Sequence, residues 1–193
     1  MSASLTDPQI AIVGTAGRGD DTVRMSLALY EAMLLDAGER IVRCWNRPVP
    51  LISGGAAWAD HVAVGLFLCG LASQLTLYLP APMDVQTGRF AEHGGWPDVG
   101  RTANYYHDIF QRMTGIDGRA QIRQAQVRGA VLDTGPGGFK ARNMKVATAC
   151  TELWAYTWGY GTEPKDGGTA HTWHATVKRR KPVLHVPLWG LVG

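Results

Sequence analysis

The stretch that decides the fold is Gln9-Ile10-Ala11-Ile12-Val13, which runs directly into Gly14-Thr15-Ala16-Gly17-Arg18-Gly19. The first five residues are short and apolar and include three β-branched side chains, which is typical of a strand buried on both faces. The glycines predict a tight turn, and residues 22–37 then carry apolar side chains at helical spacing, with Gly38 as the expected stop. This order indicates the first unit of a parallel α/β sheet.

The same order recurs along the rest of the chain. Further strands are predicted at residues 41–45, 49–52, 75–79, 153–158 and 182–186, and further helices at 58–72, 102–114, 118–129, from about 140, and at 169–179. Residues 83–101 are polar and unpatterned and predict a long loop, so the region around 83–129 is expected to be a loop and helix insert. The chain is therefore predicted to be a single α/β domain over residues 1–193, with helices on both faces of the sheet.

Composition narrows the class of partner. The chain of 193 residues is 46% apolar and 18% charged, with a net charge of +3, which indicates a globular domain with a full core. Its one basic run, Lys178-Arg179-Arg180-Lys181, falls where a helix is expected to end. A solvated helix end explains this run better than a nucleic-acid patch, so nucleic acid is an unlikely partner.

Cysteine placement and hydropathy bear on the compartment. Cys44, Cys69 and Cys150 form no CxxC pair and are expected to be reduced core residues, which favours a reducing, cytoplasmic setting. The first 14 residues lack the pattern of a secretory signal. The longest apolar run, residues 63–72, is too short to span a bilayer, so no membrane partner is expected.

Three glycine-rich turns each follow a predicted strand, at residues 14–19, 53–56 and 167–169. In a parallel sheet all three face the edge at the carboxyl ends of the strands, where ligands bind. Glycine allows backbone amides to approach a phosphate closely, and the following helix adds its positive amino end. The first turn matches neither GxGxxG nor a P-loop, and its Arg18 is either a phosphate clamp or an exposed loop residue.

The second turn is the most specific segment, Ser53-Gly54-Gly55-Ala56-Ala57-Trp58-Ala59-Asp60. Ser53 is expected to cap a helix, and its hydroxyl and the next amides are candidates to hold a phosphate or ribose. Asp60 either accepts hydrogen bonds from ribose hydroxyls or ties the first turn to a neighbouring loop.

Two later segments add candidates at the same edge. Arg142 either binds a phosphate or pairs with Asp60, and Asn143 either reads a base edge or satisfies a loop backbone. Gly168 and Thr169 are expected to present amides and a hydroxyl to an anion. Three aromatic residues, Tyr156, Trp158 and Tyr160, are available to stack on a base or to pack the core and rim, with packing favoured for Tyr156. His171 and His174 lack a third ligand at a telling spacing, so no metal site is expected.

Taken together, three motifs resemble the SLOG superfamily, especially its YspA-like branch. They are Ser-Gly-Gly-Ala-x-x-Ala-Asp at 53–60, Arg-Asn at 142–143 and Gly-Gly-Thr-x-x-Thr at 167–172. The superfamily also includes the Lonely Guy phosphoribohydrolases and the DNA-processing protein A fold. Its members occur in bacteria and phages, in part in conflict systems.

The resemblance implies a Rossmann-like domain that binds a nucleotide-type ligand, often as a homo-oligomer, with no cofactor. Carried over to this chain, it implies that Ser53, Gly54, Gly55, Gly167, Gly168 and Thr169 hold the phosphate or ribose, flanked by Arg142 and Asn143. With the residues singled out above, the full set expected at the ligand is Gly14, Thr15, Arg18, Ser53, Gly54, Gly55, Ala56, Asp60, Arg142, Asn143, Trp158, Gly167, Gly168, Thr169 and Thr172. Lonely Guy proteins carry a catalytic glutamate where this chain has Thr172. Hydrolysis of an N-glycosidic bond would therefore need another carboxylate, for which Asp60, Glu152 and Asp166 are the candidates.

Three functions follow as hypotheses. The first is a sensor or sequestering protein for a nucleotide-derived signal. The second is a hydrolase or transferase acting on the N-glycosidic bond of a nucleotide. The third, single-stranded DNA binding, is disfavoured by the absence of a basic stripe.

Overall fold

The computed structural model describes residues 8–84, 86–135 and 137–192 and shows an α/β protein with one parallel sheet. The sheet has six strands in the order β4-β3-β2-β1-β5-β6, so β1 lies at its centre. All five strand pairings are parallel. The predicted fold class, a Rossmann-like parallel sheet flanked by helices, is confirmed.

The strands are short and mostly apolar, as a sheet covered on both faces requires. They span Ile10–Gly14 (β1), Val49–Ser53 (β2), Ala72–Tyr78 (β3), Val131–Asp133 (β4), Glu152–Thr157 (β5) and Val183–Pro187 (β6). Residues 10–13 of β1 are at most 5% exposed, because neighbouring strands and helices surround them on all sides.

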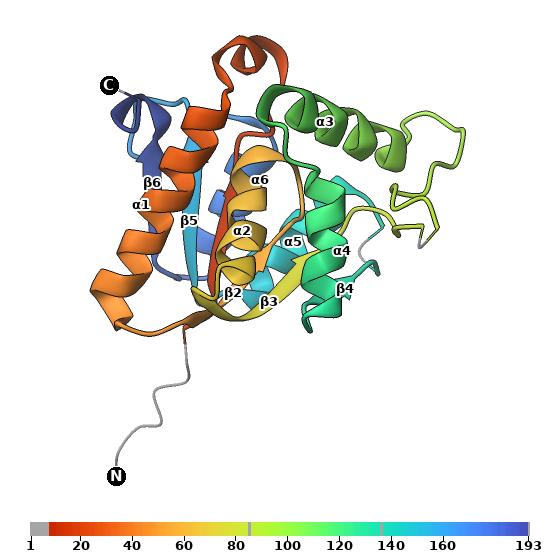
Figure 1. Cartoon of the computed structure of the whole chain (residues 1–193). Helices are drawn as coiled ribbons and strands as arrows, with labels where there is room; N and C mark the ends of the chain where they lie inside the picture. The colour runs from red at the N-terminus through yellow and green to blue at the C-terminus, as the bar shows by residue number, and fades with distance from the viewer. Residues whose placement is uncertain (1–7, 85, 136, 193) are drawn as a thin grey trace.

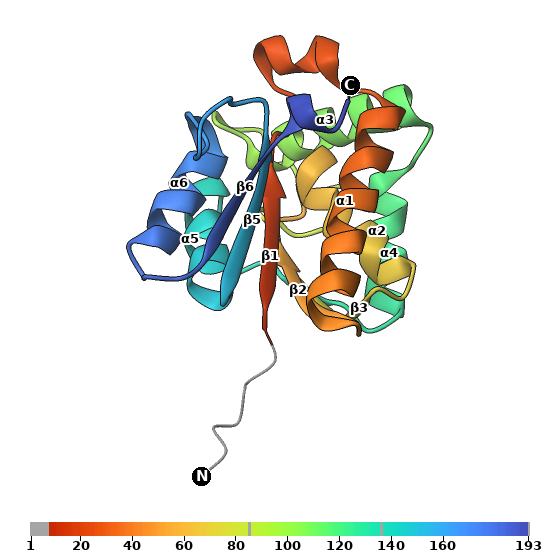
Figure 2. The same ribbon diagram turned by 90° about the vertical axis from the view of Figure 1, so that its left-hand side faces the viewer.

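Two layers of helix cover the sheet. The α-helices are Leu27–Trp45 (α1), Val62–Leu68 (α2), Val99–Thr114 (α3), Gly118–Val127 (α4), Phe139–Ala149 (α5) and Gly167–Val177 (α6). Figure 1 shows the whole chain, and Figure 2 shows α5 and α6 on one face of the sheet with α1, α2 and α4 on the other. In the same view the strands point toward the end of the molecule where α3 lies, so the carboxyl edge of the sheet is there.

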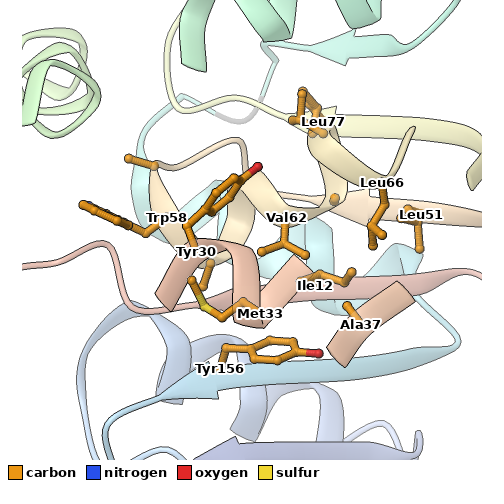
Figure 3. Packing of buried hydrophobic residues seen from close by; sticks show 14 of the residues in the cluster. Ile12, Tyr30, Met33, Ala37, Leu51, Trp58, Val62, Leu66, Leu77 and Tyr156 are labelled. Carbon is orange, nitrogen blue, oxygen red and sulfur yellow. The ribbon is translucent and has the colours of Figure 1, made fainter. Parts of the chain in front are cut away.

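The larger hydrophobic core lies between the sheet and α1 and α2. Ile12 and Leu51 from the strands meet Met33 from α1 and Leu66 from α2, each at most 1% exposed (Figure 3). Trp58 is fully buried in this core and packs edge-on against Phe110 of α3, at 4.9 Å between ring centroids. This contact fixes α3 of the insert to the body of the domain.

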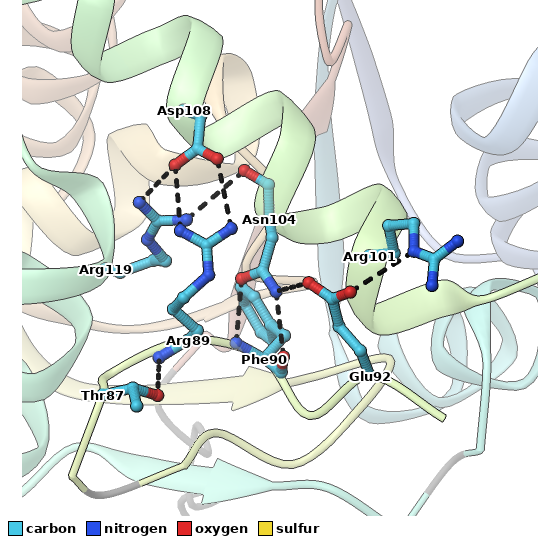
Figure 4. A network of polar contacts seen from close by, with 8 residues as sticks. All are labelled: Thr87, Arg89, Phe90, Glu92, Arg101, Asn104, Asp108 and Arg119. Atoms are coloured by element: carbon cyan, nitrogen blue, oxygen red, sulfur yellow. Dashed lines mark hydrogen bonds and ion pairs between the residues drawn. The ribbon is translucent and has the colours of Figure 1, made fainter. Parts of the chain in front are cut away.

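Polar contacts organise the insert itself (Figure 4). Asp108 on α3 accepts hydrogen bonds from Arg89 of the long loop and from Arg119 of α4. The side chain of Asn104 bonds both the amide and the carbonyl of Phe90, at 2.9 Å each. The loop and both helices are thereby joined into one unit that packs against the sheet domain.

Several expected element boundaries are wrong, each for an identifiable reason. Residues 41–45 were expected to form a strand but complete α1, because Ser26 caps the helix at its start and Asn46 ends it in the left-handed region. Gly38 is not a stop signal: it is buried inside α1, where a Cβ would lie 3.2 Å from Leu71 and 3.5 Å from Leu66. It allows α1 to approach α2 closely.

Other corrections are smaller. Thr22 belongs to a 3₁₀ helix, η1 (Gly19–Arg24), so α1 starts later than expected. Residues 58–61 form a second 3₁₀ helix, η2 (Trp58–His61), and Ala72 begins β3 instead of ending a helix. The short strand β4 was not predicted. Cys150 is buried as expected, whereas Cys44 and Cys69 are exposed, so the expectation that all three are core residues is wrong.

Candidate functional site

A cleft of about 1010 Å³ lies at the carboxyl edge of the sheet. It is bordered by the turns after β1 and β2, by η1, by the first turns of α5 and α6, and by the segment that joins β5 to α6. Most residues expected at the site do line it: Gly14, Thr15, Arg18, Gly54, Ala56, Asp60, Arg142, Asn143, Trp158, Asp166, Gly167, Gly168, Thr169 and Thr172. The sheet topology brings together segments more than 150 residues apart in the chain.

Asp60 occupies the amides that were expected to hold a phosphate. Its Oδ1 accepts a hydrogen bond from the amide of Gly14 at 3.2 Å, and the nearby amides of Gly54 and Ala56 favour the charged form of its carboxylate. The side chain is 5% exposed. Burial raises the pKa of the Asp60 carboxyl above its ordinary value, while the Arg142 charge and the three amides oppose that rise. The Asp60 carboxylate thus links the first two glycine-rich turns. This is the structural one of the two roles predicted for Asp60.

Arg142 connects this carboxylate to α5 and to the second turn. Its Nη1 lies 3.6 Å from Asp60 Oδ2 and donates to the carbonyl of Gly54 at 2.9 Å. Its Nε and Nη2 both donate to Asn143 Oδ1. Of the two alternatives for Arg142, the pairing with Asp60 is therefore present in the structure.

Asn143 and Thr169 extend the network to α6. The side-chain amide nitrogen of Asn143 donates to the carbonyl of Gly168 at 3.0 Å. Of the two roles predicted for Asn143, this contact is the one that satisfies a loop backbone. The hydroxyl of Thr169 donates to the carbonyl of Gly14 at 2.8 Å. All three glycine-rich turns are therefore cross-linked beneath the cleft, which fixes their positions before any ligand arrives.

The amino end of α6 is the part of the cleft floor that internal groups leave open. Asp166 precedes the helix without forming a side-chain cap, and Gly167 and Gly168 are exposed. The first amides of a helix have no partner within the helix, and its macrodipole places partial positive charge there. This end of α6 can accept an anion.

Besides Arg142, the guanidinium group of Arg18 lines the cleft. Arg18 is exposed, and its Cζ lies 5.0 Å from the ring centroid of Tyr106 and 5.2 Å from that of Phe139. Its charge acts on Arg142, whose pKa is lowered by burial and further by Arg18, while Asp60 opposes that shift. Arg18 is therefore an exposed residue on the lining of the cleft, and its role as a phosphate clamp stays a prediction.

Ser53, Gly55 and Glu152 do not line the cleft. Ser53 is fully buried and its hydroxyl contacts the carbonyls of Ile12 and Asp60 at 2.9 Å each, so it neither caps a helix nor faces a ligand. A Cβ on Gly55 would lie 2.3 Å from Leu79, so that glycine is required by packing. Glu152 begins β5 at the opposite edge and accepts a hydrogen bond from Trp154, out of reach of the cleft.

The three aromatic candidates for base stacking differ in burial and in whether they line the cleft. Tyr156 is buried and donates to Asp36 at 2.8 Å, which confirms its core role. Trp158 is 8% exposed and lines the cleft, and Tyr160 lines it with 81% of its surface exposed. Trp158 and Tyr160 both pack against Trp189, at 4.7 Å and 5.2 Å between ring centroids.

Sequence reasoning missed other residues of the cleft. They are chiefly Asp20, Asp21, Arg24, Phe139, Glu163, Lys165 and His174. Arg24 was missed because residues 22–37 were assigned to one helix, whereas η1 folds back over the sheet edge. The signal that could have located η1 is Ser26, a strong N-cap residue within that run.

Across residues 8–84, 86–135 and 137–192 there is no group of three or more histidine, cysteine, aspartate or glutamate side chains placed to hold a metal ion. Within the same ranges no helix is long and apolar enough to cross a membrane.

Comparison with known proteins adds one relative of undescribed function. No protein-family model matches the chain. The chain is similar to an uncharacterized protein of Acanthamoeba polyphaga mimivirus, with 28% identity over 185 residues, covering 94% of this chain and 97% of the viral protein. The similarity extends over nearly the whole of both chains, so it concerns the full domain.

Proposed function

We propose that the cleft binds a phosphate-bearing nucleotide or nucleotide-derived molecule and that the protein acts as a sensor or sequestering protein for it. The observation that carries this proposal is the placement of Arg18 and Arg142 on the lining of one cleft, beside the open amino end of α6. Among the described residues Arg18 has no carboxylate partner, so its charge is available. A guanidinium that forms no ion pair, beside the amino end of a helix, favours an anionic ligand.

The preformed network supports binding. Asp60, Arg142, Asn143 and Thr169 hold the turns in place through buried bonds, so ordering them costs little when a ligand binds. The resemblance to the SLOG superfamily, which rests on these same motifs, supports such a site, because it implies a nucleotide-type ligand. Under this proposal the protein is cytoplasmic and forms a homo-oligomer.

Chemistry at Thr172 favours binding over turnover. The hydroxyl of Thr172 donates to the carbonyl of Gly168 at 3.0 Å, and the side chain is buried in α6. A threonine bonded in this way supplies no general base at the position where Lonely Guy proteins carry glutamate. The carboxylate of Asp60 already interacts with backbone amides of the glycine-rich turns and with Arg142, so it is poorly placed to act as the general base.

One observation favours the enzymatic alternative. Asp166 lines the cleft, is exposed and caps no helix, so its carboxylate is free to approach a ligand bound at α6. In that case the protein hydrolyses or transfers the N-glycosidic bond of its nucleotide. An Asp166→Asn variant separates the two functions, because it abolishes turnover in the enzyme and leaves binding in the sensor.

The test combines binding with product analysis. Calorimetry with AMP, cyclic AMP, NAD and inorganic phosphate is run on the wild type, on Arg18→Ala and on Arg112→Ala, a variant at the exposed end of α3 that removes the same charge outside the cleft. We expect Arg18→Ala to weaken nucleotide binding about tenfold, a loss of one charge-assisted hydrogen bond. Equal affinity in Arg18→Ala and wild type overturns the assignment, and altered ligand recovered over many turnovers per protein favours the enzyme.

A further inference from the structure

The cleft contains two arginine residues, each held against a pair of aromatic rings. Arg18 lies over Tyr106 and Phe139, and Arg24 lies over Trp189 and Trp158, with Cζ at 4.8 Å and 5.7 Å from the latter two ring centroids. Among the described residues neither guanidinium forms an ion pair. Stacking fixes the plane of a guanidinium while its N–H groups remain available to a ligand.

These two arginine residues stand at opposite ends of η1. Arg18 is its N-cap and Arg24 its last residue. A 3₁₀ helix rises about 2 Å per residue, so six residues separate the two positions by about 12 Å along the chain. Each guanidinium is also held over its own pair of rings, so the two groups occupy different parts of the cleft.

The two arginine residues also fall on opposite sides of β1. Phe139 begins α5, which packs on β2 and β3, whereas Trp158 and Trp189 follow β5 and β6. Neighbouring strands are about 4.8 Å apart, so the cleft crosses the sheet edge over roughly 10 Å from β2 to β5. Thr169 bonds the carbonyl of Gly14 at the end of β1, which places the amino end of α6 between the two sides.

The Arg24 side also offers an aromatic surface. Tyr160 is 81% exposed and stacks on Trp189 with 7° between the ring planes. Beneath them the indole nitrogen of Trp158 is buried and has no hydrogen-bond partner among the described residues. An exposed ring supported by a second ring is a surface on which a planar base can stack.

From this arrangement we infer that the ligand is a dinucleotide whose two nucleoside units are joined through a pyrophosphate. The pyrophosphate lies at the amino end of α6, one nucleoside unit lies beside Arg18, and the other lies against Tyr160 and Arg24. This inference rests on the proposed function and names the ligand class for the same cleft. The cleft volume of about 1010 Å³ is at the upper end of the range for small-molecule sites, which suits a ligand of this size.

The test compares AMP, ADP and diadenosine diphosphate by calorimetry. We expect the dinucleotide to bind wild-type protein about tenfold or more tightly than ADP, because only it adds a second stacked base. Arg24→Ala and Tyr160→Ala remove this gain in affinity of the dinucleotide over ADP, while Arg112→Ala retains it. Both substituted side chains are exposed, so the variants are expected to fold.

Failure of the inference and failure of the proposed function give different results. The dinucleotide inference is overturned if ADP and the dinucleotide bind equally well, or if Tyr160→Ala weakens the binding of AMP and of the dinucleotide by the same factor. In either case the proposal that the cleft binds a nucleotide still stands. If none of the three compounds binds, both proposals are overturned.

Discussion

The Asp60 carboxylate faces the Arg142 guanidinium beneath the cleft, with Oδ2 3.6 Å from Nη1 and side-chain exposures of 5% and 11%. Two opposite charges so far from water depend on each other, because either one alone would be buried without a counter-charge. The pair also connects the second glycine-rich turn to α5. Its integrity therefore determines both stability and the shape of the site.

Removing one member of this pair is expected to be costly. We expect Asp60→Asn to lower the free energy of unfolding by about 3–5 kcal/mol, because Arg142 then stays buried without a counter-charge. Urea unfolding measures the change, with Asp20→Asn on the exposed surface of η1 as the control within about 0.5 kcal/mol of wild type. Asp60→Asn combined with Arg142→Met is expected to lose less than the sum of the single losses, and strict additivity would contradict the coupling.

The sequence predicted the sheet and the location of the site better than the detail of the site. Strand, glycine-rich turn and helix recur in order, and parallel strands must present their carboxyl ends at one edge, so Gly14, Gly54 and Gly168 were expected together. Whether an amide serves a ligand or an internal carboxylate depends on three-dimensional distances. For this reason Asp60 was a candidate for two roles, and only the structure shows that its carboxylate accepts from the Gly14 amide and faces Arg142.

Local propensity failed where tertiary packing decided the outcome. Residues 41–45 include β-branched side chains and favour a strand on propensity alone, but Ile41 is 1% exposed on the face of α1 that packs into the core. Arg24 could not be assigned to the cleft without knowing that η1 folds over the sheet edge.

A methyl group on Gly54 tests how tightly the network is packed. A Cβ there would lie 2.7 Å from both Arg142 Nη1 and Asp60 Oδ2, so those groups must separate. We expect Gly54→Ala to lose about 1–3 kcal/mol of stability and to weaken ligand binding, as overpacking does. Gly161→Ala is the matched control, since its nearest neighbour would be 3.8 Å away, and thermal melts that give both variants the same midpoint would refute the close contact.

The Thr169 hydroxyl links α6 to the end of β1, and its loss tests whether this link positions the anion site. We expect Thr169→Val to cost about 1 kcal/mol of stability, because the carbonyl of Gly14 loses its 2.8 Å hydrogen bond. Thr169→Ser is expected to retain both stability and binding. Urea unfolding and calorimetry with the bound nucleotide check both effects, and a valine variant that binds as tightly as wild type would show that the hydroxyl does not position α6.

Two buried histidine residues attach the insert to the second turn. His107 on α3 donates from Nε2 to the carbonyl of Gly55 at 3.1 Å, and Nε2 of His61 contacts Gln121 of α4 at 2.7 Å. Each Nδ1 is buried with no hydrogen-bond partner among the described residues, and the two rings lie 6.1 Å apart. Burial lowers the pKa of His61 to about 4 and that of His107 to about 3.

Acid is therefore expected to destabilise the protein through this pair. In the unfolded chain both histidine residues take up protons below a pKa of about 6.5, while the folded protein resists protonation until about pH 4 for His61 and pH 3 for His107. Stability from the pair is full above pH 6.5 and falls with decreasing pH by up to about 1.4 kcal/mol per pH unit for each histidine. Asp117 raises the pKa of both rings and Arg119 lowers that of His107, without reversing the sign.

The measurement is urea unfolding between pH 7 and 4, where His107→Gln is expected to flatten the profile, because an amide side chain can still donate to Gly55 but does not titrate. His171→Gln, on the exposed face of α6, should follow the wild-type curve. A His107→Gln profile parallel to wild type across this range would show that the buried pair does not control the acid response.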